Sequence, residues 1–120
     1  MYRIMCKSKI HRARITGALL YYEGSIAVDT DLLEAADILP GEKVEVLNLN
    51  NGSRIETYAI AGKKGSGEMC LNGPAARSGC EGDEIVVLAY AMVPENEAKN
   101  LKMKVVHVDS SNKIKNTVLR

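Results

Sequence analysis

The sequence of 120 residues predicts a small, mainly β fold: a barrel of six or seven strands with one or two short helices. Three observations lead to this prediction. Short stretches of alternating apolar and polar residues recur along the whole chain, Gly, Pro and Asn separate them, and only one segment shows helical spacing of its apolar residues. Because no repeat or linker divides the chain, we expect a single domain over residues 1–120.

The first half of the chain contains the expected helix. Residues 2–9 and 11–17 alternate as two strands, and residues 25–28 form a short extended piece. Leu32, Ala36 and Leu39 then recur at helical spacing, with Asp31 as the expected N-cap and Pro40-Gly41 as the stop.

The second half predicts strands separated by turns. They are expected over residues 43–49, 54–60, 69–71, 85–93 and 104–108. Asn51-Gly52 is a strong hairpin signal between the first two of these strands. The Gly-rich segment 62–67 is interpreted as another hairpin loop, and the polar tail after Asn112 is expected to fray.

Charge and composition argue against several classes of function. Sixteen basic and fifteen acidic residues leave a net charge of +1, and Trp and Phe are absent, which disfavours a nucleic-acid-binding protein. The longest apolar run, residues 85–93, is too short to cross a membrane, and the N-terminus lacks the pattern of a secretory signal. Three cysteines without C-x-x-C spacing and only two histidines disfavour a metal site and favour a cytoplasmic protein with reduced thiols.

Two segments could carry chemistry. Basic residues gather between Lys7 and Arg14, where Lys9 and His11 would share a strand face; this face is either solvated or part of a small anion pocket, and spacing does not decide between them. The other segment is Gly24-Ser25. If a bend holds the Ser25 hydroxyl against the Gly24 carbonyl, attack on the chain's own peptide bond becomes intramolecular, which can lower a barrier by roughly 7–11 kcal/mol.

Several motifs occur together at characteristic spacing. They are KSKIHRA at residues 7–13, YEGS at 22–25, DLLEAADIL at 31–39, NG-x-R at 51–54, TYAI at 57–60, GSG at 65–67, NG-x-AA at 72–76 and GD at 82–83. In these motifs and their order, from Met5 to about Asn112, the sequence resembles the pyruvoyl-dependent aspartate α-decarboxylases.

The resemblance implies a double-psi β-barrel enzyme that converts L-aspartate to β-alanine and CO2 for pantothenate and coenzyme A synthesis. Members of the family cut themselves, and here the cut would fall between Gly24 and Ser25, giving chains 1–24 and 25–120. Residue 25 would become a covalent pyruvoyl group that binds the substrate amine as a Schiff base, so neither an external cofactor nor a metal is implied. A homotetramer is implied as well, and the participation of a maturation factor stays open.

The same resemblance implies roles for individual residues. Ser25 and Tyr58 would be catalytic, with Tyr58 as the proton donor. The expected substrate-binding residues are Lys9, Arg54, Thr57, Asn72, Gly73, Pro74 and Ala75, with His11 and Tyr22 in support. Thr57 would also polarise the Gly24 carbonyl during self-cleavage.

Two features do not match the family pattern simply. Pro74 stands where many members have alanine and lacks an N–H donor, and Arg77 stands where several have histidine. On a regular strand, moreover, Arg54 and Tyr58 would share one face while Thr57 points to the other.

The alternative to the enzyme is a non-catalytic barrel of the same fold that binds a partner and keeps Gly24–Ser25 intact.

Overall fold

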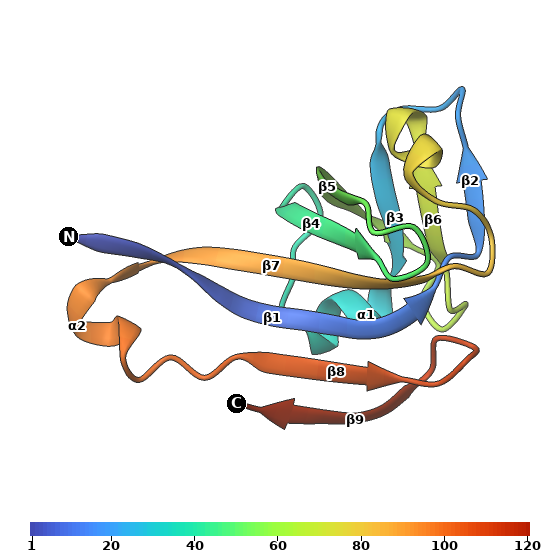
Figure 1. Ribbon diagram of the computed structural model, residues 1–120. Coiled ribbons are helices and arrows are strands. Elements are labelled where there is room, and N and C mark those ends of the chain that lie inside the picture. The colour runs from blue at the N-terminus through green and yellow to red at the C-terminus, as the bar shows by residue number, and fades with distance from the viewer.

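Strands dominate the architecture (Figure 1). The computed structural model describes residues 1–120. The elements are β1 (Tyr2–Arg14), β2 (Gly17–Leu19), β3 (Ser25–Asp29), α1 (Thr30–Ala35), β4 (Lys43–Asn48), β5 (Arg54–Gly62), β6 (Met69–Asn72), the 3-10 helix η1 (Gly73–Ser78), β7 (Glu84–Pro94), α2 (Glu95–Ala98), β8 (Lys104–Val108) and β9 (Ile114–Leu119). None of the helices combines the length and the apolar composition that crossing a bilayer requires.

One sheet closes on itself to form the barrel. Its strand order is β2-β6-β3-β5-β4-β7-β1-β8-β9. β1 and β2 are consecutive pieces of chain, and the Thr16 N–H between them donates to the Met69 carbonyl at 2.9 Å. The run from β1 into β2 therefore occupies one position, and six positions close the barrel while β8 and β9 extend it beyond β1. The predicted small, mainly β barrel is confirmed.

Alternating residues of the strands fill the barrel with a single apolar core. In β4, for example, Val44 and Val46 are buried while Glu45 between them is partly exposed, as a period of two requires. The core cluster also takes in Leu32 and Leu33 from α1 and Ala36, the C-cap residue of this short helix.

β1 is one strand of 13 residues rather than the two predicted. Its register with β7 shifts between Cys6 and Ser8 and again between Ile10 and Ala13, and Arg12 has a φ of 62°. Such bulges let a strand bend without ending, because one extra residue is accommodated opposite its partner. The boundary predicted between residues 2–9 and 11–17 therefore marks a bulge within one continuous strand.

The tail after Asn112 was wrongly expected to fray. Its residues form β9, which pairs antiparallel with β8. The buried Asn112 side chain anchors the segment, since its amide donates to the carbonyls of Arg14 and Gly67, both at 2.8 Å, and its oxygen accepts the Arg14 N–H at 2.7 Å.

The Gly-rich segment 62–67 is also not a hairpin loop. β3 lies between β5 and β6 and pairs with both, so the chain must cross the end of β3 to pass from one to the other. This crossing over a central strand is the feature of a psi motif, and hydrophobic alternation within β5 and β6 carries no signal for it.

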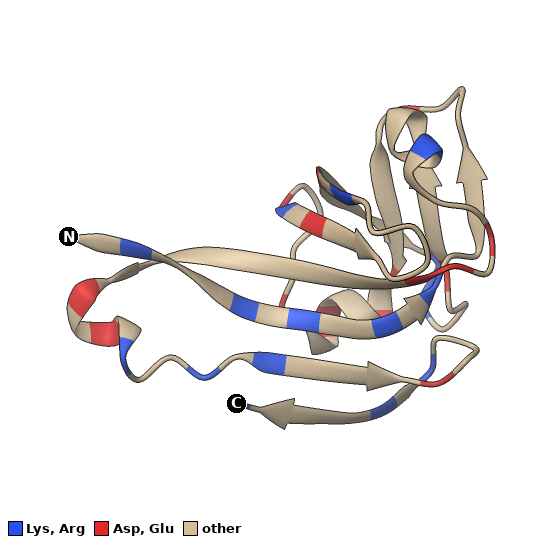
Figure 2. Ribbon diagram, viewed as in Figure 1, with Lys and Arg blue, Asp and Glu red and all other residues tan.

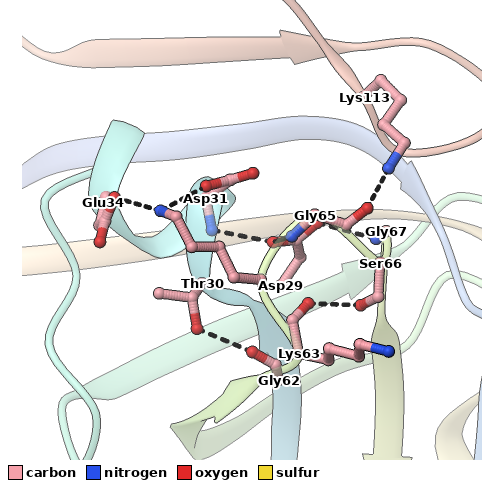
Figure 3. A network of polar contacts seen from close by, with 11 residues as sticks. Asp29, Thr30, Asp31, Glu34, Gly62, Lys63, Gly65, Ser66, Gly67 and Lys113 are labelled. Carbon is pink, nitrogen blue, oxygen red and sulfur yellow. Dashed lines mark hydrogen bonds and ion pairs between the residues drawn. The ribbon is translucent and has the colours of Figure 1, made fainter.

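The carboxylate of Asp29 holds the crossing in place (Figure 3). It is buried and accepts N–H groups from Gly65 at 2.9 Å, Gly67 at 2.8 Å and Asp31 at 2.8 Å. The bond from Asp31 makes Asp29 the N-cap of α1 in place of the predicted Asp31, and the helix ends at Ala35 rather than continuing to Leu39. Lys113 from the tail donates to the Gly65 carbonyl on the same loop.

Asp29→Ala is expected to lower the free energy of unfolding by about 2–4 kcal/mol, because three backbone N–H groups lose a charged acceptor. Burial alone would raise the pKa of Asp29, but these N–H groups hold it below its ordinary value. The stabilisation is therefore complete above the unfolded pKa of about 4 and is lost as the pH falls through the lower folded-state value. Urea unfolding at pH 7 and pH 3 measures both effects.

Asp109→Ala is the matched control, since its exposed carboxylate also accepts two backbone N–H groups. An equal loss of stability in both variants would contradict the role of burial.

Candidate active site

Ser25 is the first residue of β3 and lies opposite Asn72, the last residue of β6. Its side chain is 1% exposed. The Oγ atom accepts a hydrogen bond from Asn72 Nδ2 at 3.4 Å and donates one to the Glu23 carbonyl at 3.5 Å. Both contacts fix the orientation of the hydroxyl on the residue that directly follows the expected cleavage point.

The backbone before Ser25 is packed tightly against Gly73. A Cβ atom on Gly73 would lie 2.7 Å from Gly24 Cα, 2.9 Å from Gly24 N and 2.9 Å from the Tyr22 carbonyl oxygen. Gly73 also has a φ of +67°, which L side chains rarely adopt. Two independent constraints therefore require glycine here, and the loop after β6 presses directly on the expected cleavage site.

A pocket of about 400 Å³ opens beside Gly24. Its lining residues come from the start of β5 and from η1: Ile55, Glu56, Thr57, Tyr58, Pro74, Ala75 and Ser78, together with Gly24 itself. The structure thus gathers five of the expected site residues around one pocket, with Ser25, Asn72 and Gly73 beside it. The sequence did not point to Ile55, Glu56 or Ser78, which belong to no motif with a chemical signature.

Thr57 and Tyr58 both border this pocket, although neighbours on a strand were expected to face opposite ways. β3 and β5 run parallel, and their pairing begins only at Ile26 opposite Ala59. Residues 54–58 therefore extend beyond the start of β3, and one edge of β5 is open there. Because the pocket lies at this open edge, side chains from both faces of the strand can border it.

Arg54 does not line the pocket. Its Nη1 atom pairs with Glu45 Oε1 at 2.7 Å, and the Tyr90 hydroxyl donates to the same oxygen at 3.0 Å. Burial, followed by the neighbouring Glu45 carboxylate, raises the pKa of Tyr90. A second pocket contains Arg54, Glu45 and Tyr90 together with the apolar side chains of Ile4 and Met92.

Lys9, His11 and Tyr22 also lie outside the pocket beside Gly24. Lys and Arg recur along β1 (Figure 2). Arg12 and Arg14 line one pocket with His11 and His107, but both guanidinium groups pair there with Glu84. Lys7 pairs with Glu42 at 2.9 Å and Arg12 with Glu84 at 2.7 Å. The basic stretch is therefore mostly an ion-paired surface.

His11 faces β8, where its ring packs edge-on against His107 with the centroids 5.4 Å apart. Burial lowers the pKa of His11, and the positive charges of His107, Lys9 and Arg12 lower it further. Its surroundings therefore favour the neutral imidazole at neutral pH. Tyr22 is exposed on the loop before Gly24.

Comparison with known proteins shows the family of this chain. The sequence model of the aspartate decarboxylase family matches residues 1–115. The aspartate 1-decarboxylase of Thermoanaerobacter pseudethanolicus is 58% identical over 113 residues, which cover 94% of this chain and 97% of that protein. The aspartate 1-decarboxylase of Syntrophus aciditrophicus is 54% identical over 115 residues, covering 96% and 99%. The chain belongs to the aspartate decarboxylase family.

Proposed function

We propose that this protein decarboxylates L-aspartate to β-alanine and carbon dioxide, after cutting itself between Gly24 and Ser25 into chains 1–24 and 25–120. The observation that carries the proposal is the buried Ser25 hydroxyl, held by Asn72 next to a pocket that contains Thr57 and Tyr58. Membership of the family supports the same substrate and a role in supplying β-alanine for pantothenate. A non-catalytic barrel would have no need for this arrangement.

The self-cleavage uses groups of this chain alone. Ser25 Oγ adds to the Gly24 carbonyl carbon, the peptide C–N bond breaks, and the proton of the hydroxyl passes to the nitrogen of residue 25. The ester that forms loses the Cα proton of residue 25 and the carboxylate of Gly24 by elimination. Hydrolysis then releases ammonia and leaves a pyruvoyl group at residue 25. Thr57 lines the pocket beside Gly24, and we assign its hydroxyl as the donor to the oxygen that becomes negative in the first step.

The residues around position 25 fit a pyruvoyl group. Asn72 supplies a buried N–H donor next to the side chain of residue 25, and the pocket beside Gly24 leaves room for a substrate. Once formed, the group supplies a ketone that accepts electrons as CO2 leaves. Tyr58, which borders the pocket with 41% of its side chain exposed, donates the proton to the former α-carbon of the substrate.

The two substrate carboxylates need cations, and none lines the pocket within one chain. We propose that a second copy supplies Lys9 and Arg54, in a homotetramer with sites between protomers. The arm formed by β1 and β7 exposes 63% of Tyr2, 74% of Ile4 and 72% of Met92, which favours burial against another copy. Sedimentation of the mature protein as a single 13 kDa unit would contradict the assembly.

Mass spectrometry of the purified protein tests the proposal. We expect two chains, and the larger one should react with carbonyl reagents and resist Edman degradation. A single intact chain after prolonged incubation would support the non-catalytic barrel instead.

Tyr58→Phe should cut itself normally but turn over L-aspartate at least 100-fold more slowly, because the proton donor is lost while Ser25 and its contacts remain. Release of ¹⁴CO2 measures turnover, and gel electrophoresis measures cleavage. Tyr21→Phe is the matched control, since that ring is 96% exposed. Near-normal turnover of Tyr58→Phe would show that the proton comes from another group.

A further inference from the structure

We propose that Cys70 is a positioning residue for self-cleavage and acts through Asn72; the inference rests on the function proposed above. Cys70 and Asn72 are two residues apart on β6, so their side chains project from the same face of the strand. Both are buried, with 8% and 3% exposed. The thiol has no hydrogen bond to Ser25 and would influence the hydroxyl only through the Asn72 amide.

Three hydrogen bonds form a chain with a single direction. Cys70 Sγ donates to Asn72 Oδ1 at 3.4 Å, and Asn72 Nδ2 donates to Ser25 Oγ at 3.4 Å. Ser25 Oγ donates to the Glu23 carbonyl at 3.5 Å. A carbonyl only accepts, so the Ser25 hydrogen must point toward Glu23, and the remaining contacts of the hydroxyl oxygen must come from a donor. The NH2 end of Asn72 therefore faces Ser25, and its oxygen faces the thiol.

The orientation of the Asn72 amide matters for the nucleophile. If the amide turned over, its oxygen would face Ser25 Oγ and compete with Glu23 for the hydroxyl hydrogen. The hydroxyl would rotate, and the direction of the lone pair that has to attack the Gly24 carbonyl would change. A thiol that donates to Oδ1 disfavours this turned state, because turning the amide would replace the S–H···O bond by an N–H contact to sulfur, which is only a weak acceptor.

The surroundings of Cys70 keep the thiol able to donate. Burial raises the pKa of Cys70, and the negative charge of Glu68 raises it further, so the thiol is protonated at neutral pH. The Leu71 carbonyl is the only other acceptor of its hydrogen, at the longer distance of 3.9 Å. The bond to Asn72 is therefore the better of the two contacts.

Two substitutions at Cys70 separate donation from packing. Cys70→Ser keeps a donor in a side chain of similar size, whereas Cys70→Val fills the space without a donor. In freshly synthesised precursor, Cys70→Val should cut itself roughly threefold to tenfold more slowly, the loss expected for one neutral hydrogen bond. Cys70→Ser should cut within about twofold of the unmodified rate, and Cys6→Val, which removes a thiol remote from Ser25, should cut normally.

The appearance of chains 1–24 and 25–120 is followed by mass spectrometry, and thermal unfolding shows that each variant is folded. If Cys70→Val does not fold, Cys70→Ala replaces it in the comparison with Cys70→Ser. Cleavage of the donor-free variant at the unmodified rate would overturn the inference. Equal slowing in the serine and valine variants would also overturn it, because packing alone would then explain the effect.

A second measurement does not depend on cleavage. The two side-chain amide protons of Asn72 should keep slow solvent exchange in Cys70→Ser and exchange at least several-fold faster in Cys70→Val, as followed in ¹⁵N-labelled protein. Unchanged exchange in both variants would remove the contact between Cys70 and Asn72 from the argument. If the unmodified chain stays intact, the proposed function fails, and these amide signals still decide whether the thiol positions Asn72.

Discussion

Ser25→Ala is expected to leave one uncut chain of 120 residues that releases no detectable carbon dioxide from L-aspartate. The substitution removes the only hydroxyl that Asn72 and Glu23 hold beside the Gly24 peptide bond. Without it neither the ester nor the ketone derived from residue 25 can form. The barrel should stay folded, because alanine fits in place of serine and the loss of two long hydrogen bonds costs only about 1 kcal/mol.

Ser8→Ala is the matched control for this experiment. Ser8 is also a buried strand serine, but its hydroxyl has no hydrogen-bond partner. The control chain should therefore cut itself and turn over normally. Intact mass, circular dichroism and ¹⁴CO2 release are measured on both variants; two chains in the Ser25→Ala sample would rule out Ser25 as the nucleophile.

Local patterns in the sequence were sufficient for most strands and for the barrel class. Val44 and Val46 alternate with polar residues, and Asn51-Gly52 provides the tight turn that joins β4 to β5. The crossing of residues 62–68 could not be predicted in this way, because it depends on which strand inserts between β5 and β6. The tail likewise forms the ordered strand β9 because the Asn112 side chain donates to two carbonyls that are distant in the sequence, and no local pattern indicates such contacts.

The candidate site was predictable only through its motifs. Ser25, Thr57 and Tyr58 are ordinary strand residues taken singly, and the adjacent positions of Thr57 and Tyr58 on β5 even argued against a common pocket. The edge of β5 is open over residues 54–58, before its pairing with β3 begins at Ala59 opposite Ile26, and this resolves the conflict. The open edge follows from the register of two parallel strands that are far apart in the sequence. Arg54 shows the opposite case: its residue type suits a carboxylate, but within one chain its partner is Glu45.

Gly73→Ala is expected to block self-cleavage almost completely and to lower the melting temperature. The new Cβ would stand within 2.9 Å of three backbone atoms of residues 22 and 24, none of which belongs to a flexible side chain. Either the loop after β6 or the segment before Ser25 must move, so the Ser25 hydroxyl and the Gly24 carbonyl lose their alignment. Misplacement of about 1 Å between reacting groups costs on the order of 100-fold in rate.

Gly52→Ala separates this contact from simple backbone strain. Gly52 has a similar φ of +75°, but a Cβ there meets nothing within 4 Å. The control should lose roughly 1–2 kcal/mol of stability from its left-handed backbone and still cut itself at the normal rate. Cleavage rates and melting curves are compared at the same temperature. If the two glycine variants cut equally fast, the close approach of Gly73 to Gly24 does not align the reacting groups, and the cleavage geometry must depend on β3 and Asn72 alone.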